Sequence, residues 1–222
     1  MSHATTFSHA VIERNPAWAQ LLGLCPLLAV STSVVNAVAL ALASAFVLLG
    51  ANVCISSIRR WIPGYARLPC FVLIIATFTT CSVLLMQAYA FEMYLRIALF
   101  VQIIVTNCMI LGRIEAFASK QSPGRALVDA AGTAVGFAIA LIVMGAVREL
   151  IGRGTLFAGM ELLFPGTHGW QLSVSSNNQG LLLASLPPGA FIIAGLLLGS
   201  ANALFRRPIP DANHRPRAGT IN

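Results

Sequence analysis

The stretch TNCMILGRIEAFASK, residues 106–120, lies at the end of a long apolar segment and interrupts it with polar groups. Asn107 precedes the thiol of Cys108, and Arg113 and Glu115 follow within seven residues of that cysteine. Ionisable residues at membrane depth are candidates for function, because a charge in hydrocarbon is costly. The stretch raises two questions: whether the chain spans a membrane, and why a thiol and two charges stand where an apolar run ends.

The composition is that of a membrane protein. Of the 222 residues, 57% are hydrophobic and 9% are charged, whereas soluble domains carry about 25% charged residues. Several continuous apolar runs reach the ~20 residues that a helix needs to cross a bilayer. A β-barrel requires short alternating segments instead. The chain is predicted to be an all-α, polytopic membrane protein, with residues 1–222 forming a single membrane domain.

Six transmembrane helices are expected, separated mostly by short polar or basic stretches. Their approximate ranges are 17–31, 35–57, 68–90, 94–112, 127–147 and 181–205. The first is expected to be short or broken, because the chain before Ser57 has little room for two full spans and Pro26 removes a backbone donor. The fourth is marginal in length and has Asn107 near its end. Half-helices are therefore predicted at the first and fourth spans.

The basic residues favour cytoplasmic termini. With the N-terminus inside, most Arg and Lys residues fall in the inside loops and tails, as the positive-inside rule requires. The net charge of +7 is divided among short stretches, so membrane lipid is an expected partner and nucleic acid is not. The N-terminal sequence has no basic region leading into a long apolar run, so no cleavable signal peptide is expected.

Cys25 and Cys108 introduce two similar halves of the chain. Each cysteine is followed by a short apolar stretch, a polar break and an Ala-rich span. With three spans in each half, a duplication would be inverted in the membrane, and the two cysteines would meet near its middle. We expect repeat one at about 15–92, repeat two at about 93–206, and a basic cytoplasmic tail at 207–222.

The residues alone leave two interpretations of Cys25 and Cys108 open. Cysteine packs well in helices as a small apolar residue, but soft thiolates also select copper, zinc and iron–sulfur clusters. Two thiolates do not complete the four-cysteine set of a [2Fe–2S] cluster. If both are ligands, a second chain must supply two more. Cys54, Cys70 and Cys81 are interpreted as packing residues.

The charged residues near the span ends are interpreted as structural. Arg113 and Glu115 are expected to form an interfacial ion pair with snorkelling side chains. Asp129 is expected to stabilise the start of the fifth span. Arg148 and Glu149 are expected to end that span on the outside.

Two further segments carry expectations about shape. The sequence LPPGAF, residues 186–191, places two prolines early in the sixth span, where a kink is expected. The loop of about 150–180 is expected to form an external cap or a partner contact.

Four motifs together resemble a known family. LLGLCPLLAVST (21–32), VTNCMILGRIEAFASK (105–120), VRELIGRGTLF (147–157) and LPPGAF (186–191) are similar to the E subunits of bacterial Rnf electron-transport complexes. The D subunits of sodium-translocating NADH:quinone reductases are the next most similar. The resemblance covers nearly the whole chain and is weakest in the tails and near residues 160–180.

The resemblance implies an assembly and an activity. It implies six spans in two inverted repeats, a location in the bacterial inner membrane, and partnership with a paralogous A subunit and with subunits B, C, D and G. Cys25 and Cys108 would provide two of the four ligands of a [2Fe–2S] cluster shared with the A subunit. The complex would pass electrons between ferredoxin and NAD and couple this to Na+ or H+ translocation. No catalytic residue is expected in this chain alone.

Two other classes of function fit the sequence less well. A secondary transporter or channel with inverted repeats would need an ionisable site within a span, and no mid-span carboxylate is visible. A membrane thiol oxidoreductase would need a reactive pair such as CxxC or loop cysteines with a depressed pKa, and the sequence has neither.

Overall fold

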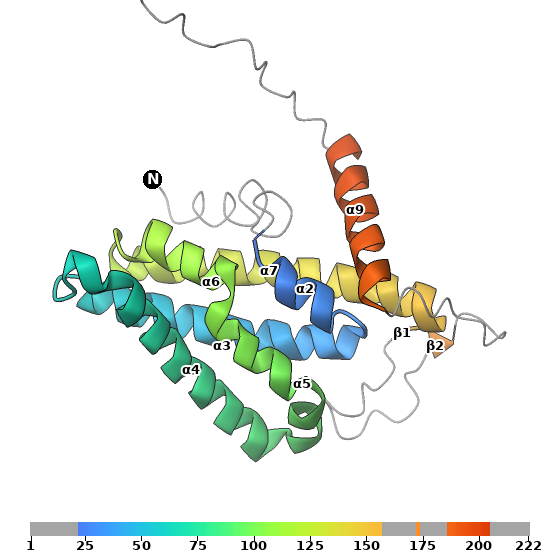
Figure 1. The fold of residues 1–222 in the computed structure, drawn as a ribbon, viewed down its shortest axis with the longest axis horizontal. Coiled ribbons are helices and arrows are strands. Elements are labelled where there is room, and N and C mark those ends of the chain that lie inside the picture. Colours follow the sequence, from blue (N-terminus) through green and yellow to red (C-terminus); the bar gives the residue numbers. More distant parts are fainter. Residues whose placement is uncertain (1–21, 157–171, 174–185, 205–222) are drawn as a thin grey trace, which may run out of the picture.

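Two long antiparallel helices form the centre of the molecule (Figure 1). The computed structural model describes residues 22–156, 172–173 and 186–204, and almost all of these are helical. The central helices are α3 (Val34–Ile58) and α7 (Pro123–Arg153). Near the end of α3, Ser56 Oγ donates a hydrogen bond to the carbonyl of Gln121, just before α7, at 2.6 Å. The start of one helix therefore lies against the end of the other.

Small side chains allow α3 and α7 to approach closely. A Cβ added at Gly145 in α7 would lie 3.2 Å from Ala37 Cβ and 3.4 Å from the Ser33 carbonyl oxygen. In lipid, helices associate through close van der Waals packing and polar contacts, which small residues make possible. The buried alanines of the two helices are Ala37, Ala39, Ala41, Ala43, Ala51, Ala126, Ala130, Ala134 and Ala140.

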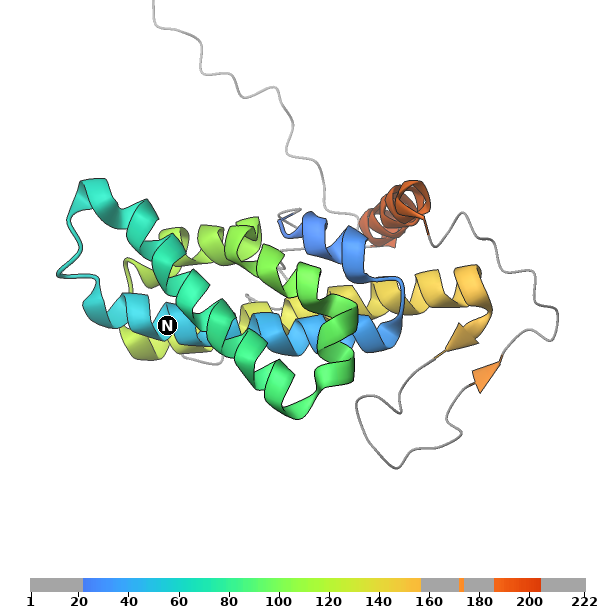
Figure 2. The same ribbon diagram turned by 60° about the horizontal axis from the view of Figure 1, so that its bottom comes forward.

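Helices α4 (Arg67–Tyr89) and α5 (Phe91–Ile103) pack against α3 (Figures 1 and 2). A short 3-10 turn, η2 (Gly64–Ala66), leads into α4. Each helix buries one stripe of residues three or four apart, the pattern of a single helix face. The remaining surface of α4 is apolar and exposed, as a surface facing lipid requires. The buried stripes are Phe71, Ile75, Thr79 and Ser82 on α4, and Met93, Ile97 and Val101 on α5.

The two segments with cysteine motifs form short helices. The first is α2 (Leu24–Val30), with seven residues. In the second, α5 continues through a 3-10 turn, η3 (Ile104–Thr106), and the chain then breaks at Asn107. It resumes as α6 (Cys108–Arg113), followed directly by a π-helix, η4 (Ile114–Ala118). Helix α2 contacts α3, α5 and α7.

The last described elements follow α7. Strands β1 (Thr155–Leu156) and β2 (Leu172–Ser173) form one short antiparallel pair. Helix α9 (Pro187–Leu204) contacts α2 and α7. A bend at Leu186 precedes it, so the two prolines open the helix. The prolines stand in the first turn of α9, where a missing N–H has no helical partner to lose. The predicted kink stays a prediction, because residues 181–185 lie outside the described residues.

Four helical segments of the described residues are long and apolar enough to cross a membrane: Val34–Ile58, Gly64–Tyr89, Phe91–Ala118 and Pro123–Gly152. They confirm the second to fifth predicted spans. The fourth and fifth are longer than expected, since helical structure continues through η4 and α7 begins before residue 127.

The two remaining spans are described only in part. Helix α2 is short, as expected for the first span, but residues 17–21 lie outside the described residues. Residues 181–185 of the sixth span, most of the 150–180 loop and the tail at 207–222 also lie outside them. The proposed limits of the two repeats stay predictions.

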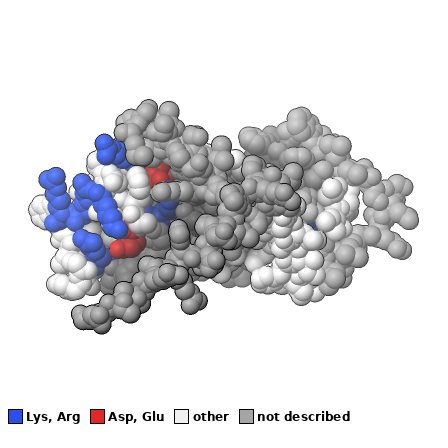
Figure 3. Space-filling model, turned by 90° about the horizontal axis from the view of Figure 1, so that it is seen from above, with Lys and Arg blue, Asp and Glu red and all other residues white. Residues whose placement is uncertain are grey.

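Basic side chains gather at one end of the molecule (Figure 3). There α3 ends, and α4 and α7 begin. Such an asymmetry along the spans is what the positive-inside rule describes. The basic residues in these connections are Arg59, Arg60, Arg67, Lys120 and Arg125.

We predict that Gly145→Leu lowers the free energy of unfolding by about 1–3 kcal/mol, the usual cost of overpacking a tight contact. The added side chain would push α7 away from Ala37 and Ser33. Thermal unfolding of the purified protein in detergent measures the effect. Gly124→Leu on the same helix is the control, because no atom lies within 4 Å of a Cβ there. Equal losses in the two variants would contradict the prediction.

Candidate functional site

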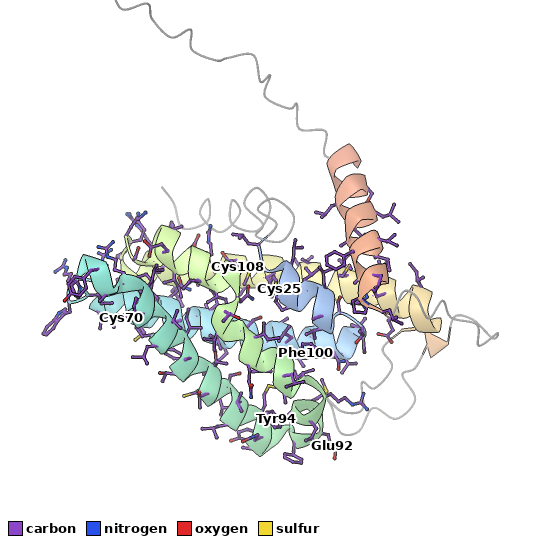
Figure 4. The ribbon with its side chains drawn as sticks, viewed as in Figure 1. Cys25, Cys70, Glu92, Tyr94, Phe100 and Cys108 are labelled. Carbon is purple, nitrogen blue, oxygen red and sulfur yellow. The ribbon has the colours of Figure 1, made fainter. Side chains whose placement is uncertain are left out.

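The candidate site lies where the starts of α2 and α6 meet. A Cβ at Gly23 would be 3.3 Å from Asn107 Oδ1 and 3.3 Å from Met109 Cβ. Cys25 is the second residue of α2, and Cys108 is the first residue of α6. Both thiols are exposed on this chain, and Figure 4 shows them on the same side of the molecule. The structure thus brings together two segments whose cysteines are 83 positions apart in the sequence.

Gly23 is required at this contact for two reasons. Its φ of 78° lies in the left-handed region, which strongly favours glycine. A Cβ there would also meet Phe137 Cε2 of α7 at 3.0 Å. A side chain at position 23 would therefore strain the backbone and separate α2 from α6 and α7.

Asn107 joins the two cysteine segments through its side chain. It is only 2% exposed, and its Oδ1 accepts a hydrogen bond from the Met109 backbone N–H at 3.0 Å, which caps the start of α6. Its Nδ2 is buried and has no hydrogen-bond partner among the described residues. A buried donor without a partner costs free energy. This donor stands next to Cys108, at the contact with the Cys25 segment.

A buried ion pair attaches the Cys108 segment to α7. Arg113 donates two hydrogen bonds to Asp129, from Nε to Oδ2 at 3.1 Å and from Nη2 to Oδ1. Both side chains are largely buried. Two parallel hydrogen bonds between guanidinium and carboxylate make such a pair strong and directional.

The predicted pairing of Arg113 with Glu115 is wrong. Residues two apart on a helix do not face one another, whereas Asp129 of α7 lies within reach of the guanidinium. Glu115 belongs to the π-helix η4, and its Oε2 is buried without a hydrogen-bond partner in the described part of the chain. The role expected for Asp129 at the helix start is wrong, because α7 begins at Pro123 and Asp129 lies beyond its first turn, where it contacts Arg113.

Arg148 and Glu149 attach the Cys25 segment to the other end of α7. Arg148 Nη1 donates to the Leu28 carbonyl at 2.8 Å and to Ser31 Oγ at 3.0 Å. Glu149 Oε2 accepts a hydrogen bond from the Val34 backbone N–H at 2.8 Å. The two side chains are 2% and 0% exposed. They lie near the end of the span as expected, but they are buried in protein contacts.

The other cysteines lie on α3 and α4. Cys54 and Cys70 are half-buried and Cys81 is exposed. Figure 4 shows Cys70 well away from Cys25 and Cys108. Within the described ranges, no three His, Cys, Asp or Glu side chains gather as a metal site would require. The described part of this chain therefore shows no complete metal site of its own.

These features define a class of helical, polytopic membrane protein in which two short cysteine-bearing helices meet beside a central antiparallel pair. The chain belongs to the Rnf-Nqr family of membrane-protein subunits, whose family model matches residues 3–198. The resemblance seen in the sequence motifs is thereby confirmed.

Relatives in several bacteria are similar along most of the chain. A protein of Pseudomonas paraeruginosa, named as the E subunit of an ion-translocating oxidoreductase complex, is 50% identical over 193 residues, which cover 86% of this chain and 81% of the relative. Proteins with the same name from Vibrio vulnificus and Aliivibrio fischeri are 47% identical over 203 residues and 44% identical over 210 residues. These two alignments cover 91% and 93% of this chain, and 88% and 91% of the relatives.

We predict that Gly23→Ala lowers the free energy of unfolding by about 1–2 kcal/mol, the cost of a left-handed backbone with a Cβ. Gly112→Ala is the control in the neighbouring helix. There a Cβ meets only Leu22 Cδ1 at an ordinary 3.8 Å, and alanine is favoured in a helix interior by about 1 kcal/mol. Thermal unfolding should move in opposite directions for the two variants. A neutral Gly23→Ala would show that the contact between α2 and α6 is not constrained.

Proposed function

We propose that this chain is the E subunit of an ion-translocating oxidoreductase complex of the Rnf type, and that Cys25 and Cys108 hold half of an intramembrane [2Fe–2S] cluster. The names and coverage of the relatives support the first part. The contact between Gly23 and Asn107 supports the proposed cluster site, because the starts of the two cysteine-bearing helices lie side by side there.

The donor set fits half of such a cluster. A [2Fe–2S] cluster is held by four cysteine thiolates, and both thiols are exposed on this chain, where a second protein can reach the same iron atoms. We propose that a paralogous A subunit supplies the other two thiolates. The buried and unpaired Nδ2 of Asn107 is compatible with a sulfur acceptor that arrives with the bound group.

The chain's own residues provide a protected site for electron transfer. A bound [2Fe–2S] cluster supplies a one-electron couple. Cys25 and Cys108 would hold the cluster as thiolates, whose negative charge bound iron would compensate. Met109, Ile110 and Phe137 are almost fully buried near these helix starts, so they exclude water from this side of the site. In this proposal catalysis belongs to the assembled complex, and the present chain acts as an electron-carrying subunit.

The topology of the described helices supports an inverted duplication. Each short cysteine-bearing helix is followed by a long helix, α2 by α3 and α6 by α7, and the two long helices are antiparallel. We propose six spans in two inverted repeats. The basic end of the molecule supports cytoplasmic termini in a bacterial inner membrane.

We propose that the complex couples electron transfer between ferredoxin and NAD to translocation of Na+ or H+. In this scheme the present chain carries electrons through the membrane, and nucleotide and flavin sites belong to other subunits. Partners B, C, D and G complete the assembly.

The test is an electron paramagnetic resonance spectrum of the dithionite-reduced complex. Cys25→Ser and Cys108→Ser should each abolish the [2Fe–2S] signal and the matching iron and acid-labile sulfide, because a hydroxyl is a poor ligand for this iron. Cys81→Ser is the matched control, since Cys81 is also exposed but lies on α4.

Two results would contradict the proposed function. One is a full cluster in either of the Cys25 or Cys108 variants. The other is equal loss of cluster in the Cys81 variant, which would show that any thiol substitution disturbs the assembly. Gel filtration of every variant establishes that the complex is intact.

A further inference from the structure

The break between α2 and α3 leaves backbone groups that need hydrogen-bond partners from elsewhere in the protein. Residues 31–33 separate the seven residues of α2 from the 25 residues of α3. The last four carbonyls of a helix and its first four N–H groups have no partner within the helix. Ser31 and Ser33 at this break are only 0% and 6% exposed, so other protein groups must pair with the backbone there.

Two consecutive residues of α7 supply these partners. Arg148 donates to the Leu28 carbonyl, one of the last four of α2, and to the hydroxyl of Ser31 at the break. Ser31 in turn donates its hydroxyl hydrogen to the Leu27 carbonyl. Glu149 accepts from the N–H of Val34, the first residue of α3. One end of α7 therefore pairs with both sides of the break.

Helix α2 cannot hold its own position. An isolated helix shorter than about 12 residues is marginal in water, and α2 has seven. It is fastened at both ends to α7. At its start, Gly23 lies against Phe137, and at its end, Leu28 and Ser31 are held by Arg148. Cys25 lies between these two attachments.

We propose that Arg148 is a positioning residue for Cys25. It fixes the end of α2 and thereby holds the Cys25 thiol in the place from which it binds the cluster, while Glu149 fixes the start of α3 in the same contact. This inference rests on the proposed function of Cys25. Cys108 is held by a different attachment, the pair of Arg113 with Asp129, so Arg148 acts on one ligand of the pair.

Cluster retention in the purified complex tests this role. Arg148→Gln should increase the rate of iron loss to a chelator by about 10-fold or more, the usual effect of removing a group that orients a metal ligand. It should also change the paramagnetic resonance spectrum of the cluster. Arg148→Lys keeps the charge but not the guanidinium geometry, and should lie between Arg148→Gln and the wild type. Ser31→Ala removes one acceptor of Arg148 and should shift the spectrum less, in the same direction.

Two controls separate positioning from general stability. Arg96→Gln removes an exposed arginine and should match the wild type in iron retention. Gly50→Ala destabilises a distant contact, because its Cβ would lie 2.5 Å from the Phe78 ring. This variant should unfold at a lower temperature yet retain iron as the wild type does.

The outcomes distinguish this inference from the proposed function. A wild-type complex without a [2Fe–2S] signal overturns the proposed function. A wild-type signal with Arg148→Gln retaining iron like the wild type, or no worse than Gly50→Ala, overturns the positioning role alone. If the Arg148→Gln complex does not assemble, the Ser31→Ala variant provides the test. A wild-type spectrum and wild-type iron retention in Ser31→Ala would refute the positioning role.

Discussion

The need to pair buried backbone groups at a helix break is the constraint on which this structure depends. The break between α2 and α3 is buried in the protein, and it leaves backbone donors and acceptors without partners in their own helices. Charged side chains of α7 contact the broken segments. An unbroken helix would pair these backbone groups internally and would not need such contacts. Arg148 and Glu149 pair with the groups exposed between α2 and α3, and Asp129 pairs with Arg113 beside the second cysteine segment.

The close packing of α3 and α7 makes these contacts possible. Gly145 and Ala37 let the two backbones approach, and this brings Glu149 within hydrogen-bond distance of Val34. Small residues of α7 thus set the distance between α3 and α7. At that distance, charged residues near the end of α7 can reach and fix the short helix α2.

The sequence predicted the spans well, because long apolar runs and polar breaks are local signals. The ranges 35–57 and 68–90 match α3 and α4 within one residue at each end. It also placed breaks near Cys25 and Asn107. The contacts of the charged residues were not predictable in this way. Arg148 and Leu28 are 120 positions apart in the sequence, and Glu149 and Val34 are 115 apart. No local sequence pattern predicts partners at such separations. The one local signal was that both ionisable residues precede the end of a long apolar helix, where a buried charge needs a partner.

The different ranges of these signals suggest how the site is encoded. The proposed ligands are marked locally, by a cysteine beside a helix break, and Gly23 and Asn107 shape those breaks within two residues of each thiol. The two cysteine segments also share a partner far away in the sequence, because α7 contacts the first segment through Phe137 and Arg148 and the second through Asp129. A helix that carries no cysteine therefore holds both cysteine segments.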